Sequence, residues 1–126
     1  METLKAHILY IEDHDDTVQF VKLALAGLNY RVTTSSTIAA GLTLARENDF
    51  DLYILDSWLP DGSGIDLCKR LREFDQSTPI LFFSGAAYEA DKQSAINSGA
   101  QRYVIKPASF ELLCREVTTL MAAFKK

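Results

Sequence analysis

Five short runs rich in β-branched, aromatic and other apolar residues recur along the chain. Such runs predict β-strands, and they are HILYI (7–11), YRVTT (30–34), DLYIL (51–55), PILFF (79–83) and RYVIK (102–106). The first and fourth are almost continuously apolar, as is the third once Asp51 is set aside, which is typical of strands covered on both faces. The second and fifth alternate more, as expected at the edges of a sheet.

The segments between these runs carry apolar residues at helical spacing. Residues 16–28 place Val18, Val21, Leu25 and Leu28 on one stripe, and Asn29 follows as a helix stop. We predict further helices over 37–47, 64–74 and 87–98, the last of these being the most polar. A final helix begins after a Ser109 cap and shows four apolar residues at regular spacing: Leu113, Val117, Leu120 and Phe124.

Strand and helix thus alternate five times, without a repeat, a low-complexity segment or a linker. This alternation predicts an α/β fold with an open parallel sheet between two helical layers. The 126 residues are enough for one core, so we expect a single domain over 1–126 with no output domain.

Composition and charge narrow the class of protein. The net charge of −4 argues against a protein that coats nucleic acid or an anionic membrane. The opening METLKAHILYIEDHDD lacks the pattern of a signal peptide, and we expect a cytoplasmic chain. Cys68 and Cys114 form no metal-binding pattern, so we interpret them as reduced side chains.

Candidate site residues lie at the ends of four of the five predicted strands, whereas the second strand offers only Thr33, Thr34 and Ser35. In an open parallel sheet, ligands bind outside the carboxyl ends of the strands. The residues at these ends are Glu12 and Asp13, Asp56, Ser84, and Lys106 and Pro107. We therefore expect three acids, a hydroxyl group and a lysine to lie in one cluster.

This combination of groups suits a phosphoryl group and a hard cation. Adjacent carboxylates repel one another, and oxygen ligands without Cys favour Mg²⁺, Mn²⁺ or Ca²⁺. A carboxylate can also attack phosphorus to form an aspartyl-phosphate. A lysine, a hydroxyl group and a cation would stabilise the charge on the transferring group.

The sequence resembles the receiver domain of bacterial two-component response regulators over essentially its whole length. The resemblance is carried by YIEDHDD, YILDSWLPDGSG, FFSG, GAQRYVIKP and the five-fold strand–helix spacing. It implies a flavodoxin-like (βα)5 fold with strand order 2-1-3-4-5. It also implies a regulatory domain, which is no enzyme beyond assisting its own phosphorylation and dephosphorylation.

The resemblance assigns a role to each residue of the cluster. Asp56 would be the phosphoacceptor, with Ser84 and Lys106 beside the phosphoryl group. Mg²⁺ or Mn²⁺ would be held by Glu12, through a water molecule, and by Asp13, Asp56 and the backbone carbonyl of Trp58. Ser84 and Tyr103 would form the switch, and the Lys106–Pro107 peptide bond is expected to be cis.

The implied partners are proteins. A histidine kinase or phosphotransfer protein would supply the phosphoryl group from a phosphohistidine. A downstream target or output domain would bind the face formed by the fourth helix, fifth strand and fifth helix. We expect no direct binding to nucleic acid or membrane. We also expect a monomer or weak dimer, since Arg102 occupies the place of an acid that forms inter-subunit ion pairs in DNA-binding members.

Other interpretations of these residues stay open. A Mg²⁺-dependent phosphatase would need a second acid at position 58, where this chain has tryptophan, and a flavin carrier would need a phosphate-binding loop in place of EDHDD. A receiver that works unphosphorylated as a fixed interaction module is a third alternative. Locally, His14 is interpreted as a solvated loop residue, and Asp15 and Asp16 as acids that favour a helix N-terminus.

Overall fold

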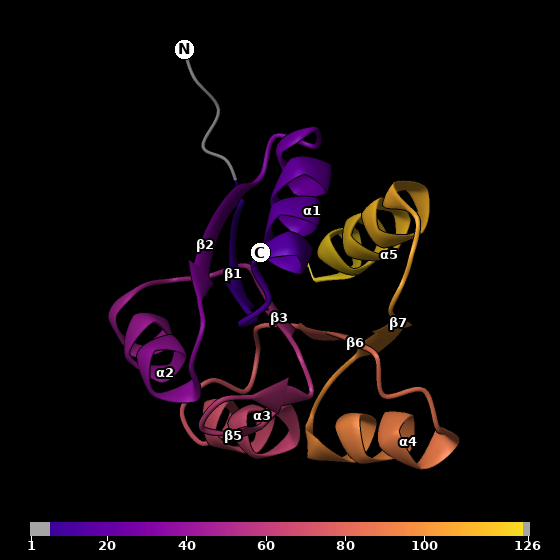
Figure 1. Cartoon of the computed structure of the whole chain (residues 1–126). Coiled ribbons are helices and arrows are strands. Elements are labelled where there is room, and N and C mark those ends of the chain that lie inside the picture. The colour runs from indigo at the N-terminus through magenta and orange to yellow at the C-terminus, as the bar shows by residue number, and fades with distance from the viewer. Residues whose placement is uncertain (1–5, 125–126) are drawn as a thin grey trace.

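Five parallel strands form the central sheet of the chain, as seen in a computed structural model that describes residues 6–124 (Figure 1). Their order across the sheet is β2-β1-β3-β6-β7, which matches the predicted order 2-1-3-4-5 once the short hairpin strands β4 and β5 are left out of the count. The bounds are β1 His7–Ile11, β2 Arg31–Ser35, β3 Leu52–Leu55, β6 Ile80–Ser84 and β7 Arg102–Ile105. Each lies within one residue of its prediction.

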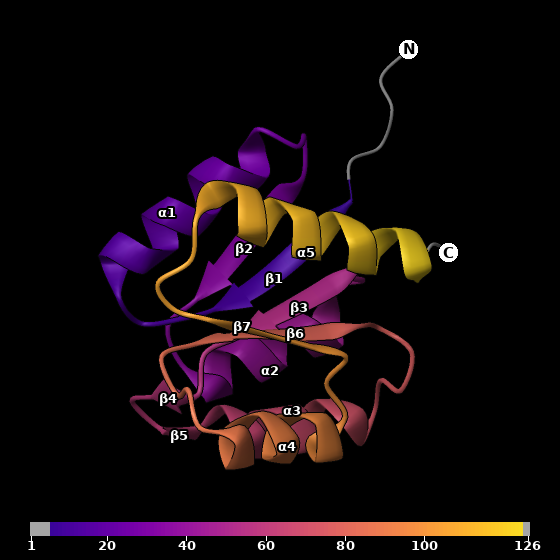
Figure 2. The ribbon, with the colours of Figure 1, turned by 90° about the vertical axis from the view of Figure 1, so that its right-hand side faces the viewer.

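Helices cover both faces of this sheet (Figure 2). Helices α1 and α5 lie on one face, and α2, α3 and α4 lie on the other. Their bounds are α1 Asp15–Ala26, α2 Ile38–Glu47, α3 Gly64–Arg72, α4 Glu89–Ser98 and α5 Phe110–Ala123. The flavodoxin-like (βα)5 prediction is confirmed, with the predicted edge strands at the two edges.

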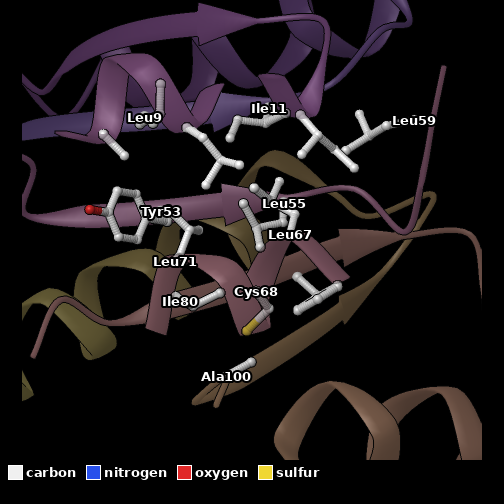
Figure 3. Packing of buried hydrophobic residues seen from close by; sticks show 14 of the residues in the cluster. Leu9, Ile11, Tyr53, Leu55, Leu59, Leu67, Cys68, Leu71, Ile80 and Ala100 are labelled. Atoms are coloured by element: carbon white, nitrogen blue, oxygen red, sulfur yellow. The ribbon is translucent and has the colours of Figure 1, made fainter. Parts of the chain in front are cut away.

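The continuous apolar runs are explained by burial on both faces of the inner strands. Successive side chains of a strand point to opposite faces. Ile8 and Tyr10 of β1 therefore pack with α1 and α5, whereas Leu9 and Ile11 pack with α2 and α3. Figure 3 shows part of the second cluster, where residues of β1, β3 and β6 meet Leu67, Cys68 and Leu71 of α3.

The sheet also separates the two cysteines. Cys68 lies in the cluster beneath α2, α3 and α4, and Cys114 packs against the opposite cluster. Both are free thiols, as predicted.

Helix ends differ from the predictions more than strand ends do. The helix predicted to reach residue 28 ends at Ala26, and Leu28 lies in the following turn with its side chain partly exposed. The chain reverses at Asn29, whose φ of 66° is left-handed, so the predicted stop is confirmed but the apolar stripe is shorter. The Ser109 cap is confirmed, since its hydroxyl group accepts a hydrogen bond from the Leu112 amide.

A two-stranded antiparallel hairpin follows β3 and was not predicted. It pairs β4 (Trp58–Leu59) with β5 (Gly62–Ser63) across the Pro60–Asp61 turn. The Asp61 carboxylate accepts hydrogen bonds from the Ile38 and Ala39 amides at 2.8 and 3.0 Å, and therefore caps α2 from outside that helix. The hairpin is thus fixed to its neighbouring helix.

Within residues 6–124, no helix is both long enough and apolar enough to cross a membrane. The first five residues of the opening segment, for which the sequence predicted no signal peptide, lie outside the described part of the chain.

Candidate functional site

The carboxyl ends of the strands meet at one edge of the sheet, where the sequence predicted a polar cluster. Parallel pairing places Ile11 opposite Leu55, and Ser84 opposite Ile105. The backbone ladder continues one residue further, because the Asp56 amide donates to the Ile11 carbonyl at 3.2 Å. Likewise, the Lys106 amide donates to the Ser84 carbonyl at 2.8 Å. The carboxyl ends of β1, β3, β6 and β7 are therefore held side by side.

Lys106 bridges two of the predicted acids. Its Nζ atom lies 2.5 Å from Oε1 of Glu12 and 3.2 Å from Oδ1 of Asp56. The same ammonium group lies 5.6 Å from the centre of the Phe83 ring. The lysine therefore links the ends of β1, β3 and β7.

Glu12 is a buried carboxylate with a full set of partners. Only 2% of the residue is exposed, and Tyr10 donates its hydroxyl hydrogen to Oε1 at 2.9 Å. Burial opposes the ionisation of Glu12, but the Lys106 ammonium group and the hydrogen bonds from Tyr10 and His14 outweigh it and hold its pKa below the ordinary value. Glu12 is therefore a fixed negative charge beside Asp56.

Asp56 is in a different environment, although it shares the same lysine. The residue is only 3% exposed. Burial and then repulsion by Glu12 raise the pKa of Asp56 above its ordinary value, against the opposing attraction of Lys106. Asp56 is thus the carboxylate of this pair that is less stabilised in its ionised form.

Asp13 tests whether the site suits a cation. Its Oδ1 atom is buried and accepts no hydrogen bond from the described residues. With Glu12 and Asp56 it contributes three formal negative charges, against one positive charge from Lys106, so two remain uncompensated. Hard carboxylate oxygens and an unfilled acceptor fit a divalent cation such as Mg²⁺.

His14 lies next to these acids but faces solvent. Its side chain is 74% exposed, and Nδ1 lies 3.5 Å from Glu12 and 3.6 Å from Asp13. One ligand atom from each of these three residues lies within 4.8 Å of the others. The interpretation of His14 as a solvated loop residue agrees with this exposure.

Ser84 is the fully buried hydroxyl group of the site, and it faces Ser57. Its Oγ donates to Oγ of Ser57 at 2.7 Å and accepts the Ala86 amide hydrogen at 3.0 Å. The Ala86 carbonyl in turn accepts the Tyr103 hydroxyl hydrogen at 2.6 Å. Ser84 and Tyr103, the predicted switch pair, are therefore joined through one residue of the β6–α4 loop.

Two predicted residues lie at the rim of the cluster. Trp58 follows Asp56 by two residues, and 64% of it is exposed. Tyr103 stacks on Phe82, with the ring centres 5.7 Å apart, and its hydroxyl group is directed to Ala86 rather than to the acids.

The Lys106–Pro107 peptide bond is cis, as predicted.

Comparison with known protein families identifies this arrangement. The sequence model of the response regulator receiver domain matches residues 8–118. The chain belongs to this receiver domain family. Phosphorylation and Mg²⁺ are typical of the family, and its members are regulatory domains of two-component signalling.

Individual relatives agree with this assignment. The receiver domain is 35% identical over 115 residues to the response regulator ArlR of Staphylococcus haemolyticus, covering 91% of this chain and 52% of the relative. The chain thus spans about half the length of the curated relatives it matches. A two-component response regulator from Clostridium difficile superposes with a TM-score of 0.91 at 26% identity, over 97% of this chain and all (100%) of that one.

A more distant neighbour supports the fold alone. It is a CheY-like receiver domain protein from Methanospirillum hungatei JF-1, with a TM-score of 0.92 at 22% identity. The alignment covers 97% of this chain and 98% of that one.

Three further residues of the site were not predicted from the sequence. Tyr10 was predicted only as part of the first strand, but its hydroxyl group donates to Glu12, the residue just after β1. Ser57, which lies between Asp56 and Trp58, was not predicted to belong to the site. Gly64 approaches Asp56 so closely that a Cβ atom would lie 2.0 Å from the Asp56 carbonyl oxygen. No periodic pattern signals such a contact.

Proposed function

We propose that this receiver domain is a switch that takes a phosphoryl group on Asp56 and then changes its affinity for a protein partner. One observation carries the proposal: Lys106 joins Asp56 to the fixed charge of Glu12, beside an Asp13 oxygen that has no hydrogen-bond partner among residues 6–124. In this proposal Asp56 is the nucleophile, Glu12 and Asp13 help to bind the cation, and Lys106 supplies the positive charge.

The transfer begins from the phosphohistidine of a histidine kinase or phosphotransfer protein. A carboxylate oxygen of Asp56 forms the new bond to phosphorus, the bond from phosphorus to the imidazole nitrogen breaks, and the electron pair stays on that nitrogen. Lys106 and the Ser84 hydroxyl group would donate hydrogen bonds to the phosphoryl oxygens. The domain assists this reaction on itself and acts on no other substrate.

A divalent cation completes the site in this proposal. Glu12, Asp13, Asp56 and the backbone carbonyl of Trp58 would hold Mg²⁺, and Mn²⁺ would fit the same oxygen ligands. The cation would offset the negative charge that accumulates on the oxygens of the transferring group. Lys106 cannot do this alone, because it already faces two carboxylates.

The change caused by phosphorylation would reach the protein surface through Ser84 and Tyr103. Ser84 closes onto the phosphoryl group, and the Tyr103 side chain responds through the β6–α4 loop that both contact. The surface that changes would be formed by α4, β7 and α5. Exposed Ile96 of α4 supplies an apolar contact there, which suits a protein target or an output domain.

We further propose that residues 1–126 form a single receiver domain that works in the cytoplasm as a monomer or weak dimer. Its contacts would be with proteins rather than with nucleic acid or membrane. Arg102 is exposed on edge strand β7, where an acidic residue would be needed for reciprocal ion pairs between two copies.

Trp58 provides the test, because it is the only tryptophan and lies two residues from Asp56. We expect Mg²⁺ to change its fluorescence, and beryllofluoride, a mimic of the phosphoryl group, to change it again only when Mg²⁺ is present. Asp56→Asn should lose the second change. Asp49→Asn, which alters an exposed acid after α2, should keep both. An unchanged beryllofluoride response in Asp56→Asn would contradict the proposal.

A further inference from the structure

The hydrogen bond between Ser84 and Ser57 lies between the phosphoacceptor and the switch. Ser84 is fully buried, and its hydroxyl group has only one hydrogen to donate. That hydrogen is directed to Oγ of Ser57 at 2.7 Å, while the Ala86 amide occupies an acceptor position of Ser84. A buried hydroxyl group without an acceptor is unfavourable, so Ser57 stabilises this orientation.

Ser57 is itself held in place on both sides. Its backbone amide donates to the Asp56 carboxylate, and its carbonyl oxygen accepts the Gly64 amide hydrogen at 2.9 Å. The Ser57 hydroxyl group is therefore fixed beside the acceptor residue and opposite the end of β6. It occupies a position from which it can compete for the Ser84 hydrogen.

We propose that Ser57 is a positioning residue that holds the Ser84 hydroxyl group in its resting orientation. This inference rests on the proposed function, because a phosphoryl group on Asp56 must take the same hydrogen. The single hydroxyl hydrogen of Ser84 can be donated to Ser57 or to a phosphoryl oxygen, but not to both in one linear hydrogen bond. Ser57 therefore biases the domain toward the resting state, and phosphorylation must overcome this bias.

The bias extends to Tyr103 along the same hydrogen-bonded chain. The Ser84 oxygen accepts the Ala86 amide hydrogen, and the Ala86 carbonyl accepts the Tyr103 hydroxyl hydrogen. When the Ser84 side chain turns away from Ser57, the hydrogen bond to the Ala86 amide changes, and Ala86 is the residue that Tyr103 contacts. Ser57 acts at one end of this chain and the proposed output surface lies at the other.

The test compares beryllofluoride affinities in the presence of Mg²⁺ by isothermal titration calorimetry. Ser57→Ala should bind about five-fold more tightly than the natural sequence, which is the value of one hydrogen bond between neutral groups. Ser57→Thr keeps the hydroxyl group and should restore the original affinity. In a Ser84→Ala background, Ser57→Ala should change nothing, because the hydrogen for which Ser57 competes is then absent.

A second readout follows the Ala86 amide by NMR. In beryllofluoride-free Ser57→Ala, its signal should move toward the position that it takes in the beryllofluoride-bound natural sequence. Equal or weaker affinity of Ser57→Ala, or an effect that persists without the Ser84 hydroxyl group, would overturn the positioning role. If the natural sequence itself fails to bind beryllofluoride with Mg²⁺, the proposed function is wrong and this inference falls with it.

Discussion

Gly64 allows the Asp56 backbone to lie close to the start of α3, because glycine has no side chain. A Cβ atom at this position would lie 2.0 Å from the Asp56 carbonyl oxygen and 3.0 Å from the Phe82 ring. Helix α3 can therefore begin directly beside the Asp56 backbone. The close approach of the Asp56 and Gly64 backbones thus depends on the absence of a side chain at residue 64.

We expect Gly64→Ala to lower the free energy of unfolding by about 3 kcal/mol, because the overlap is with backbone atoms that cannot turn away. Urea denaturation measures this difference. Gly27→Ala is the matched control, because the nearest atom to its Cβ would be 3.5 Å away and its φ of −63° suits alanine. Gly64→Ala with the stability of the control would show that the contact is not restrictive.

Helices and strands were predicted best where the hydrophobic pattern was strongest. The inner strands are buried on both faces, and their bounds were predicted to within one residue. The β4–β5 hairpin was missed because two residues per strand are too few to show a period. The end of α1 was misjudged because the turn at Asn29, rather than the apolar spacing, decides where the helix stops.

The loop between α3 and β6 is organised by a single carboxylate. Asp75 accepts the Tyr53 hydroxyl hydrogen at 2.7 Å, and its other oxygen accepts the Ser77 and Thr78 amide hydrogens. Burial opposes its ionisation, but these hydrogen bonds outweigh it and lower the pKa of Asp75 to about 2. The ionised form therefore stabilises the folded loop.

We expect Asp75→Asn to lower the free energy of unfolding at pH 7 by about 1 kcal/mol, less than the full pKa shift would give because solvent screens a partly exposed carboxylate. A depressed pKa contributes stability above the unfolded value of about 4, and this stability is lost as the pH falls toward 2. The difference in free energy of unfolding between Asp75→Asn and the natural sequence should thus become smaller from pH 5 to pH 3, as measured by urea denaturation. A gap independent of pH would contradict the role of the charge, and Asp49→Asn should show no comparable gap.

At the scale of the whole molecule, the candidate site is a consequence of parallel topology. Residues separated by up to 94 positions, such as Glu12 and Lys106, meet because every strand ends at the same edge of the sheet. That is why the sequence could predict which residues gather there. It could not predict that Ser84 would face Ser57 or that Tyr103 would contact Ala86, because those contacts depend on side-chain directions that no spacing encodes.

The most direct test of the account is whether Asp56 accepts a phosphoryl group. Intact mass should be recorded after incubation with acetyl phosphate, a small phosphoryl donor, with Mg²⁺ and with EDTA. We expect one phosphoryl group per chain with Mg²⁺, none with EDTA, none in Asp56→Asn and an unchanged adduct in Asp49→Asn. A chain that stays unmodified with Mg²⁺, or an Asp56→Asn variant that is still modified, would contradict the account.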